Sequence, residues 1–489
     1  MKTLFTNATF YSMRFENEAY RSILVEDGII LDVFQNIPST TANIVDLQGA
    51  FVYPGFIDTH THSFEGGLYS LGVSLEAVKS IPETLELLAE ATPIGGLVFA
   101  YHYDENLTAE KRFPTLEELD AIFPNTPLLL RRVDGHSCVI NSEAVKRIPW
   151  KEALPAGFDG ILRKEWNDVA AHWFHSNIDD EGILKAYQQA AKLAVKGGHT
   201  CIHTMIGDAA YSPTHYALIE KNKHLFPIEY ITYPQMFDIQ KAIELGAKRI
   251  GGCILADGSF GSHTAALFQP YIDEPANNGI LYHDDDFWNA FIMEAHEKNL
   301  QVAVHCIGDR AVNQILSAYE KAQQKNPKDL RHELIHCELM NDEMLTRAAR
   351  AKVSCVVQPM FDRLWGGDSD LYAKVLGVER AMLTNRFQSQ QKKGILCTGG
   401  SDWYITDLDA LKGIDAAVRH HNPNEALKPY DAVKLYTVNA AKLSHDENRL
   451  GIIAHGYQAD FTCLEKNILT ATDITSIAIK AVYKKGVKV

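Results

Sequence analysis

Short apolar runs alternate with amphipathic stretches through the middle of the chain, and this alternation predicts an α/β fold. Helices are predicted between the runs, for example over Asp286–Lys298 and Asp409–Arg419. Eight runs are predicted strands: the run into His60 and residues 200–203, 228–231, 253–256, 302–305, 334–336, 353–357 and 395–398. Eight strands that alternate with helices are typical of a (β/α)8 TIM-like barrel, whose active site lies at the carboxyl ends of the strands.

The two chain ends have a different texture, with short β-type runs separated by turns. Ser22–Val25 and Ile29–Val33 flank an Asp-Gly turn, which is a good hairpin signal. Two further runs between residues 459 and 487 read as strands. Neither end holds enough core to stand alone, so residues 1–53 and 446–489 are predicted to pair into one small composite β-sandwich.

The gap between the first and second predicted barrel strands is too long for a single loop. Residues 64–180 are therefore predicted to form an inserted subdomain over the barrel mouth, which leaves residues 54–63 and 181–445 for the barrel. The insert holds its own strand-like run, Leu128–Val133, which leads into a polar segment that contains His136.

Two histidines close the stretch Pro54–His62, which follows the apolar run Ala50–Tyr53. Alternate residues of a strand project to the same side, so His60 and His62 point the same way, together with Asp58. Two imidazoles on one face at the end of a strand can hold one divalent cation. A bare His-x-His pair is weak support for a metal site. Three residues further along strengthen it, because each ends an apolar run: His305, His336 and Asp402.

These segments resemble the metal motifs of the amidohydrolase superfamily. The matching stretches are Pro54–His62, Val304–Arg310 with its HxxGD-like pattern, Leu334–Glu338 and the Ser-Asp pair in Gly399–Trp403. From Leu24 to the C-terminus the chain is similar to the YtcJ-like branch, often called amidohydrolase family 3. The resemblance implies the barrel and the composite β-domain. It also implies five metal ligands: His60, His62, His305, His336 and Asp402.

The fourth strand departs from the family pattern. Relatives usually carry a carbamylated lysine that bridges two metals, four residues before an Asp-Gly pair. Here the pair is Asp257-Gly258 and the matching residue is Cys253, whose thiolate is a candidate bridge. Two alternatives stay open: Cys253 is a core residue, or Glu165 and His203 supply further ligands. The sequence therefore fits one or two ions per chain.

Three residues are predicted to contact substrate. His136 lies in a segment similar to the family's GHxxxxNS signature, and either reaches the substrate from above the barrel mouth or forms hydrogen bonds inside the insert. His263 stands where relatives often have an arginine, which signals a different specificity. Arg331, just ahead of the sixth strand, is the third candidate.

The chemistry follows from what these groups can do. Imidazoles with a carboxylate bind Zn²⁺, or Mn²⁺ or Fe²⁺, and leave a position open for water. The predicted cofactor is therefore a divalent metal, with Zn²⁺ as the first choice. The ion lowers the pKa of water from ~15.7 towards ~7. Asp402 is the predicted catalytic residue, which accepts a proton from water and delivers it to the leaving nitrogen.

Composition limits the partners. A formal net charge of -15 and a pI near 5.7 argue against a nucleic-acid-binding protein, which needs a basic face. The N-terminus lacks the apolar core of a signal peptide, and no run of ~18 apolar residues predicts a membrane span. The eight scattered cysteines contain no CxxC pair, which indicates reduced thiols and a cytoplasmic protein. The expected partner is a small-molecule substrate, and a homodimer is left open.

The leading hypothesis is a metal-dependent hydrolase of a non-peptide C–N bond, such as that of an N-acyl amine, a formamide or a cyclic amide. An aminohydrolase that releases ammonia from a heterocycle would use the same metal chemistry. The third hypothesis is a non-catalytic scaffold, because barrels host many functions. The presence of all five family ligands argues against the scaffold, and the substrate is beyond the sequence.

Overall fold

The computed structural model describes residues 2–133, 137–154, 157–207 and 215–489. The chain forms two compact units, one of Met1–His62 with Ala191–Val489 and one of Ser63–Ala190. The first unit contains both chain ends and all the strands predicted for the barrel. The three-part division that the sequence suggested, with its boundaries, stays a prediction.

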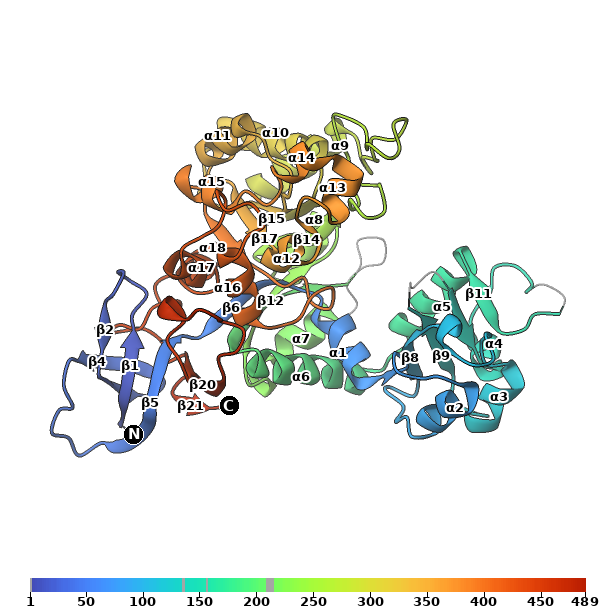
Figure 1. The fold of residues 1–489 in the computed structure, drawn as a ribbon, viewed down its shortest axis with the longest axis horizontal. Helices are drawn as coiled ribbons and strands as arrows, with labels where there is room; N and C mark the ends of the chain where they lie inside the picture. Colours follow the sequence, from blue (N-terminus) through green and yellow to red (C-terminus); the bar gives the residue numbers. More distant parts are fainter. Residues whose placement is uncertain (1, 134–136, 155–156, 208–214) are drawn as a thin grey trace. The chain divides into compact units, whose positions relative to one another are not determined.

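Strands from both chain ends form one eight-stranded sheet in the first unit (Figure 1). β1 (Thr3–Tyr11) runs parallel to β5 (Asn43–Pro54), which pairs antiparallel with β19 (Phe461–Leu464). The other members are β2 (Ala19–Tyr20), β3 (Ser22–Glu26), β4 (Ile29–Phe34), β20 (Ile479–Lys484) and β21 (Val487–Lys488). The predicted hairpin is confirmed as β3 and β4. The ring of Phe5 packs 5.1 Å from Phe461 and 5.3 Å from Tyr483, so the two ends share a core. A second layer that would make this sheet a sandwich stays a prediction.

The eight predicted barrel strands are present, and they lie in two parallel sheets. The three-stranded sheet holds β13 (Glu229–Pro234), β12 (His199–Ile206) and β6 (Phe56–Thr61). The five-stranded sheet holds β14 (Arg249–Leu255), β15 (Gln301–Cys306), β16 (Glu333–His336), β17 (Ser354–Val357) and β18 (Cys397–Gly399). Among the described residues, neither β13 and β14 nor β18 and β6 pair as strands. The fold is therefore mixed α/β, and closure into a TIM-like barrel is not confirmed.

Side chains from the two sheets nevertheless share one core. Ile57 of β6 and Met205 of β12 belong to the same hydrophobic cluster as Ala303 of β15 and Ile335 of β16. The hydroxyl of Tyr233, in β13, donates a 2.8 Å hydrogen bond to the carboxylate of Glu333, in β16. These contacts hold the interior faces of the two sheets against each other.

The first predicted barrel strand is divided into two. The apolar run Ala50–Tyr53 lies in β5 of the end sheet, whereas the histidine motif begins a new strand, β6. Gly55 separates them, and a Cβ on Gly55 would lie 2.1 Å from Thr200 Oγ1. Only glycine allows the backbone to pass so close to β12. The apolar run therefore leads into the site without belonging to its strand.

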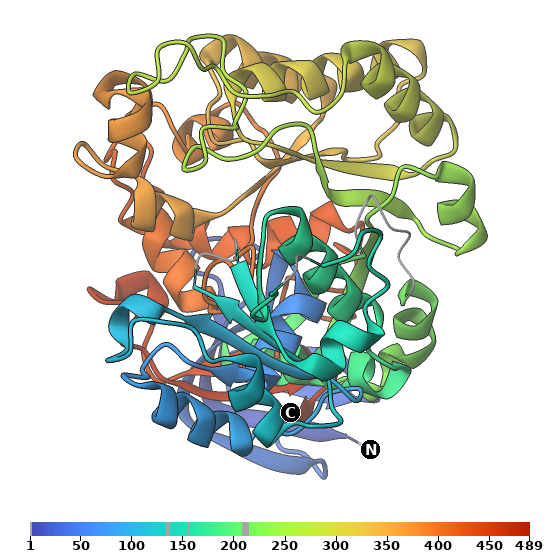
Figure 2. The ribbon, with the colours of Figure 1, turned by 90° about the vertical axis from the view of Figure 1, so that its right-hand side faces the viewer.

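Helices cover one face of the five-stranded sheet, as α9, α10 and α11 show (Figures 1 and 2). The two helices predicted as examples are confirmed as α9 (Asp285–Glu297) and α16 (Ala410–Val418). The remaining helices of this unit are α7 (Tyr216–Asn222), α8 (Ile239–Glu244), α10 (Asp309–Lys325), α11 (Asp342–Ala351), α12 (Pro359–Trp365), α13 (Leu371–Leu376), α14 (Val378–Ala381), α15 (Phe387–Lys392), α17 (Pro429–Leu435) and α18 (Val438–Leu443). Within the described ranges, every helix falls short of the length and apolar character that crossing a bilayer requires.

The second unit has its own five-stranded sheet. Its strands are β11 (Ile161–Arg163), β10 (Ser137–Ile140), β9 (Leu128–Arg132), β8 (Val98–Tyr103) and β7 (Val73–Ser74). The run predicted over residues 128–133 is thus confirmed as β9. The helices are α1 (Ser63–Leu71), α2 (Ile81–Ala89), α3 (Leu116–Ile122), α4 (Ser142–Arg147) and α5 (Glu165–Ser176), and α6 (Asp180–Lys196) continues into the first unit.

Candidate metal centre

The structure brings the five predicted ligands together at the carboxyl ends of four strands. The ring of His60, in β6, lies 5.4 Å from the rings of both His62 and His336. The rings of His305 and His336, on neighbouring strands, are 4.5 Å apart. Asp402 follows β18, and its Oδ1 lies 3.3 Å from His60 Nε2 and 3.1 Å from His62 Nε2. Residues up to 342 positions apart in sequence (402 − 60) thus form one cluster.

Cys253, in β14, is shared by two sets of potential ligands. One set is His60, His62 and Cys253, and the other is Cys253, His305 and His336. Within each set the ligand atoms lie within 4.8 Å of one another. Burial favours the neutral thiol, but the four imidazoles outweigh it and hold the pKa of Cys253 well below its usual value. The thiolate is the form of cysteine that binds metals.

The backbone around the cluster is held in unusual conformations. His336 and Asp402 have left-handed φ angles of 68° and 53°. Such conformations cost about 1–3 kcal/mol each and persist where neighbouring contacts enforce them. The buried carboxylate of Asp58 supplies such contacts, because it accepts hydrogen bonds from the N–H groups of His60 at 3.0 Å and Ser401 at 3.0 Å. Asp58 thereby ties β6 to the segment that carries Asp402.

Hydrogen bonds fix the orientation of two histidines. His336 Nδ1 lies 2.7 Å from Gln358 Oε1, and His305 Nε2 lies 3.0 Å from the carbonyl of Gly258. Both oxygens accept only, so these nitrogens carry the protons and the other nitrogen of each ring is free to bind a cation. His305 Nδ1 is the nitrogen that faces Cys253, at 3.9 Å from Sγ. The buried carboxylate of Asp257 lies 3.7 Å from His305 Nε2 on the far side.

A divalent metal fits this donor set. His60 is fully buried, and neither of its ring nitrogens makes a hydrogen bond to a described residue. Asp402 Oδ1 is also buried and makes no hydrogen bond to a described residue. An unsatisfied buried polar group costs about 1–3 kcal/mol, and more when it is charged. Burial disfavours a charged His60, yet Asp402 and Cys253 outweigh it and raise the pKa of His60 to about 9. A cation among these groups would satisfy Asp402 Oδ1 and one of the two ring nitrogens of His60.

The residues predicted to contact substrate lie elsewhere. His136 falls outside the described residues. His263 pairs through Nε2 with Asp273 Oδ2 at 2.9 Å. It does not line the cavity that adjoins His305, His336 and Asp402. Arg331 precedes β16, at the opposite end of the strand from His336, and its guanidinium binds the carboxylate of Glu447. The structure therefore does not bring His263 or Arg331 to the cluster.

Of the two alternative ligands, His203 lies in the first unit with these sets, and Glu165 lies in the second unit. His203 is buried in β12, and its Nδ1 lies 3.2 Å from the hydroxyl of Tyr233. Burial holds the pKa of His203 well below its usual value. Among the described residues, His203 belongs to none of the ligand sets. Glu165 begins α5 in the second unit.

The sequence interpretation missed the residues that surround the ligands. Gln358 and Glu338 were not singled out, although each is a polar residue at the end of a buried strand. A cavity of about 270 Å³ adjoins His305, His336 and Asp402, and Glu338 lines it together with several aromatic side chains. Three of the aromatic residues come from α12 and α13, short helices whose position only the folded chain defines, and Phe260 comes from the loop after β14.

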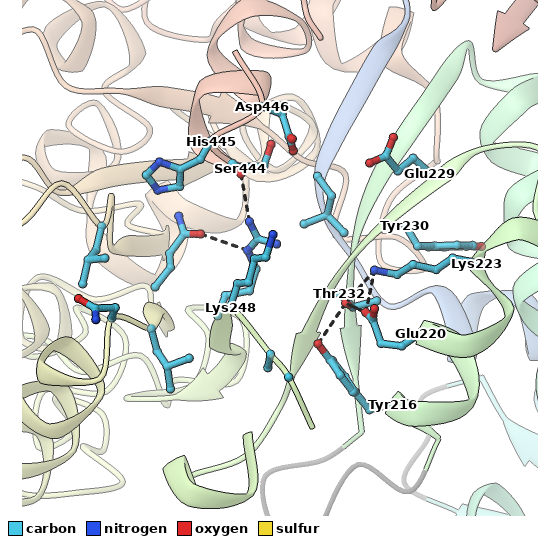
Figure 3. A pocket seen from close by; sticks show the side chains of 18 of the residues that line it. Tyr216, Glu220, Lys223, Glu229, Tyr230, Thr232, Lys248, Ser444, His445 and Asp446 are labelled. Atoms are coloured by element: carbon cyan, nitrogen blue, oxygen red, sulfur yellow. Dashed lines mark hydrogen bonds and ion pairs between the residues drawn. The ribbon is translucent and has the colours of Figure 1, made fainter. Parts of the chain in front are cut away.

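A larger cavity, of about 680 Å³, lies at the amino ends of β13, β14 and β15 (Figure 3). Figure 3 shows Tyr216, Glu220 and Lys223 gathered around Thr232. Lys223 and Glu220 form an ion pair of 2.7 Å. None of the metal-ligand sets found among the described residues lines this cavity. The cavity beside the histidines is therefore the candidate site of chemistry.

Comparisons with known proteins agree with this choice. The model of the amidohydrolase family matches residues 43–489. A putative amidohydrolase of Bacillus subtilis, YtcJ, is 31% identical over 95% of this chain and 94% of its own length. An N-substituted formamide deformylase of Arthrobacter pascens is 21% identical over 98% of this chain and 97% of its own. The crystal structure of an uncharacterized metal-dependent hydrolase from Pyrococcus furiosus superposes with a TM-score of 0.83 at 26% identity, over 96% of this chain and all of that one.

Proposed function

The chain belongs to the amidohydrolase family of metal-dependent hydrolases, and from this premise we propose that it cleaves a non-peptide C–N bond of an N-acyl amine, a formamide or a cyclic amide. The observation that supports the proposal most is the convergence of four histidines, Cys253 and Asp402 beside a cavity of about 270 Å³. The eight strands are proposed to act as one (β/α)8 barrel with this centre at their carboxyl ends.

Two cation positions are proposed, with Zn²⁺ as the ion. His60 and His62 would hold one ion, and His305 and His336 would hold the other. Cys253 would bridge them as a thiolate, because its Sγ belongs to both ligand sets. When bound, such ions polarise a carbonyl and lower the pKa of water towards ~7.

Asp402 is proposed to move the proton. Burial favours its neutral form, but His60 and His62 outweigh it and hold the pKa of Asp402 well below its usual value. The carboxylate is therefore available to take a proton from water as the new C–O bond forms. It then returns that proton to the amide nitrogen as the C–N bond breaks. One water is consumed, and the products are a carboxylic acid and an amine, which stay joined in one molecule where the substrate is a cyclic amide.

Metal removal and restoration test the proposal. The purified chain is treated with a chelator and assayed with N-acyl and N-formyl amines, with and without added Zn²⁺. We expect hydrolysis in the metal-loaded protein alone, with one carboxylate and one amine released per turnover. A matched assay with heterocyclic amines measures ammonia. Ammonia release without amide hydrolysis would make the protein an aminohydrolase. No turnover in either assay, with metal bound, would contradict the proposal.

A further inference from the structure

The cavity beside the histidines is walled mainly by apolar side chains. Phe260 comes from the loop after β14, Phe361 and Trp365 come from α12, and Leu371 and Tyr372 come from α13. At about 270 Å³ the cavity is just below the usual range of small-molecule sites, about 300–1,000 Å³. It suits a substituent of the size of one substituted ring.

The aromatic rings form a continuous wall that begins at a metal ligand. Phe361 stacks on His336, with 5.6 Å between centroids and 8° between planes. Trp365 lies 4.6 Å from Phe361 and 6.4 Å from Tyr372. Tyr372 meets Phe260 edge to face at 5.1 Å. A flat apolar group attached to an amide at the histidines would therefore contact ring faces along its length.

The lining of the cavity offers few partners to a negatively charged group. Among the described residues that line the cavity, none is a lysine or an arginine. Two carboxyl groups line it instead, those of Asp402 and Glu338. Glu338 is buried and accepts a hydrogen bond from the hydroxyl of Tyr372. Beyond the histidines, an anionic substituent would find no cationic partner among the described residues that line the cavity.

We propose that this cavity binds the uncharged aryl or branched alkyl substituent of the amide and rejects a substituent that carries a carboxylate. The inference rests on the proposed function, because it assumes that the scissile amide lies at the histidines. It excludes N-acyl amino acids and dipeptides as preferred substrates and favours amides of simple arylalkyl amines.

The size of the expected difference in binding affinity follows from the cost of burying an unpaired charge. Removing a carboxylate from water without a partner costs several kcal/mol, and each 1.4 kcal/mol is tenfold in affinity. We therefore expect the carboxylate to weaken binding by at least about 100-fold relative to a methyl group of similar size.

The test compares two ligands that differ only far from the amide. N-acetyl-4-methylphenethylamine and its 4-carboxy analogue place a methyl or a carboxylate at the ring position most distant from the carbonyl. Equilibrium binding to the zinc-loaded full chain is measured by tryptophan fluorescence, and hydrolysis of both compounds is measured in parallel. We expect the methyl compound to bind at least about 100-fold more tightly. Equal binding, tighter binding of the carboxylate, or binding of neither compound would overturn the inference. A binding preference without hydrolysis would leave the inference standing and count against the proposed function.

Two variants test whether the substituent binds in this cavity. Trp365→Ala should weaken binding of the methyl compound about tenfold, because it removes a large ring from the wall. Leu364→Ala is the matched control on the same helix, since Leu364 is 49% exposed and does not line the cavity. Circular dichroism checks that each variant is folded. Unchanged binding of the methyl compound in a folded Trp365→Ala would place the substituent outside this cavity and overturn the inference.

Discussion

At the scale of single residues, the candidate centre depends on neighbours that hold two of its histidines in one orientation. Gln358 accepts from His336 Nδ1, and the carbonyl of Gly258 accepts from His305 Nε2. The carboxylate of Asp58 accepts hydrogen bonds from the backbone N–H groups of His60 and Ser401, on both sides of the site. The ligands are thus oriented before any ion arrives, which lowers the entropy that binding would otherwise cost.

Gln358→Ala should lower metal affinity about 10–100-fold, because His336 loses the acceptor that fixes its protonated nitrogen. The variant should remain folded. Competition with a fluorescent zinc chelator measures the affinity. Gln240→Ala, at an exposed position in α8, is the matched control and should bind metal as the wild type does. Equal affinities in both variants would mean that Gln358 does not orient the ligand.

Asp402→Asn should reduce turnover by about 10²–10⁴-fold while most metal stays bound, because asparagine coordinates weakly but accepts no proton at neutral pH. Steady-state kinetics with a substrate from the amide panel measures the effect. Asp407→Asn is the control and should retain full turnover. Asp407 is exposed, lies five residues after Asp402 and forms an ion pair with Lys412. A kcat close to wild type in Asp402→Asn would remove Asp402 from proton transfer.

The sequence was informative where chemistry restricts the residue type. His60, His62, His305, His336 and Asp402 ended apolar runs, and the structure gathers all of them. Glu338 and Gln358 had the same signal, a polar residue at the end of a buried strand, but no motif distinguished them from turn residues. Arg331 precedes a strand and so lies at the opposite end from the ligands, where it binds Glu447, and its contact with substrate stays a prediction.

At the scale of elements, ion pairs connect the strands of the site to the end sheet. Glu229 begins β13, and its carboxylate lies 3.0 Å from Arg449 Nη1 and 3.2 Å from Lys484 Nζ of β20. Burial raises the pKa of Glu229, but these two cations outweigh burial and lower it to about 2. The pair network therefore links the three-stranded sheet to the C-terminal strands.

The lowered pKa of Glu229 makes the stabilisation that its ion pairs provide dependent on pH. The unfolded chain protonates Glu229 near ~4.3, whereas the folded chain resists protonation down to about 2. The stabilisation is complete above ~4.3 and is lost as pH falls towards about 2. Urea unfolding of wild type and Glu229→Gln should therefore differ most near neutral pH and converge in acid. Glu181→Gln, an exposed control, should match wild type throughout. A difference that does not change with pH would contradict this role.

The pattern of apolar residues does not predict every boundary between strands or the position of every short helix. The run Ala50–Tyr53 and the histidine motif form one apolar stretch in sequence, yet they divide between β5 and β6 at Gly55. The division depends on the approach of Thr200 from β12, a contact between residues about 145 positions apart (200 − 55). Short helices such as α12 and α13 likewise take their positions from tertiary packing, so the aromatic wall was not visible in the sequence.

At the scale of the whole molecule, the first unit joins the two chain ends through one sheet. β19 is the neighbour of β5, and β5 is the neighbour of β1. Deleting residues 461–489 should therefore expose the N-terminal strands to protease, because β5 loses one of its two neighbours and Phe5 loses two aromatic contacts. Limited proteolysis followed by mass spectrometry of residues 1–50 measures this. Deletion of residues 485–489 alone removes only β21 and is the control. Unchanged protection in the longer deletion would mean that the ends fold independently.

Metal content per chain tests whether Cys253 bridges two ions, on which the proposed chemistry depends. Elemental analysis after zinc loading should find two ions in the wild type and one in Cys253→Ala, because the two ligand sets share only this thiolate. Cys463→Ala, in the end sheet, should keep both ions. Two ions in a folded Cys253→Ala, or a single ion in the wild type, would contradict the account.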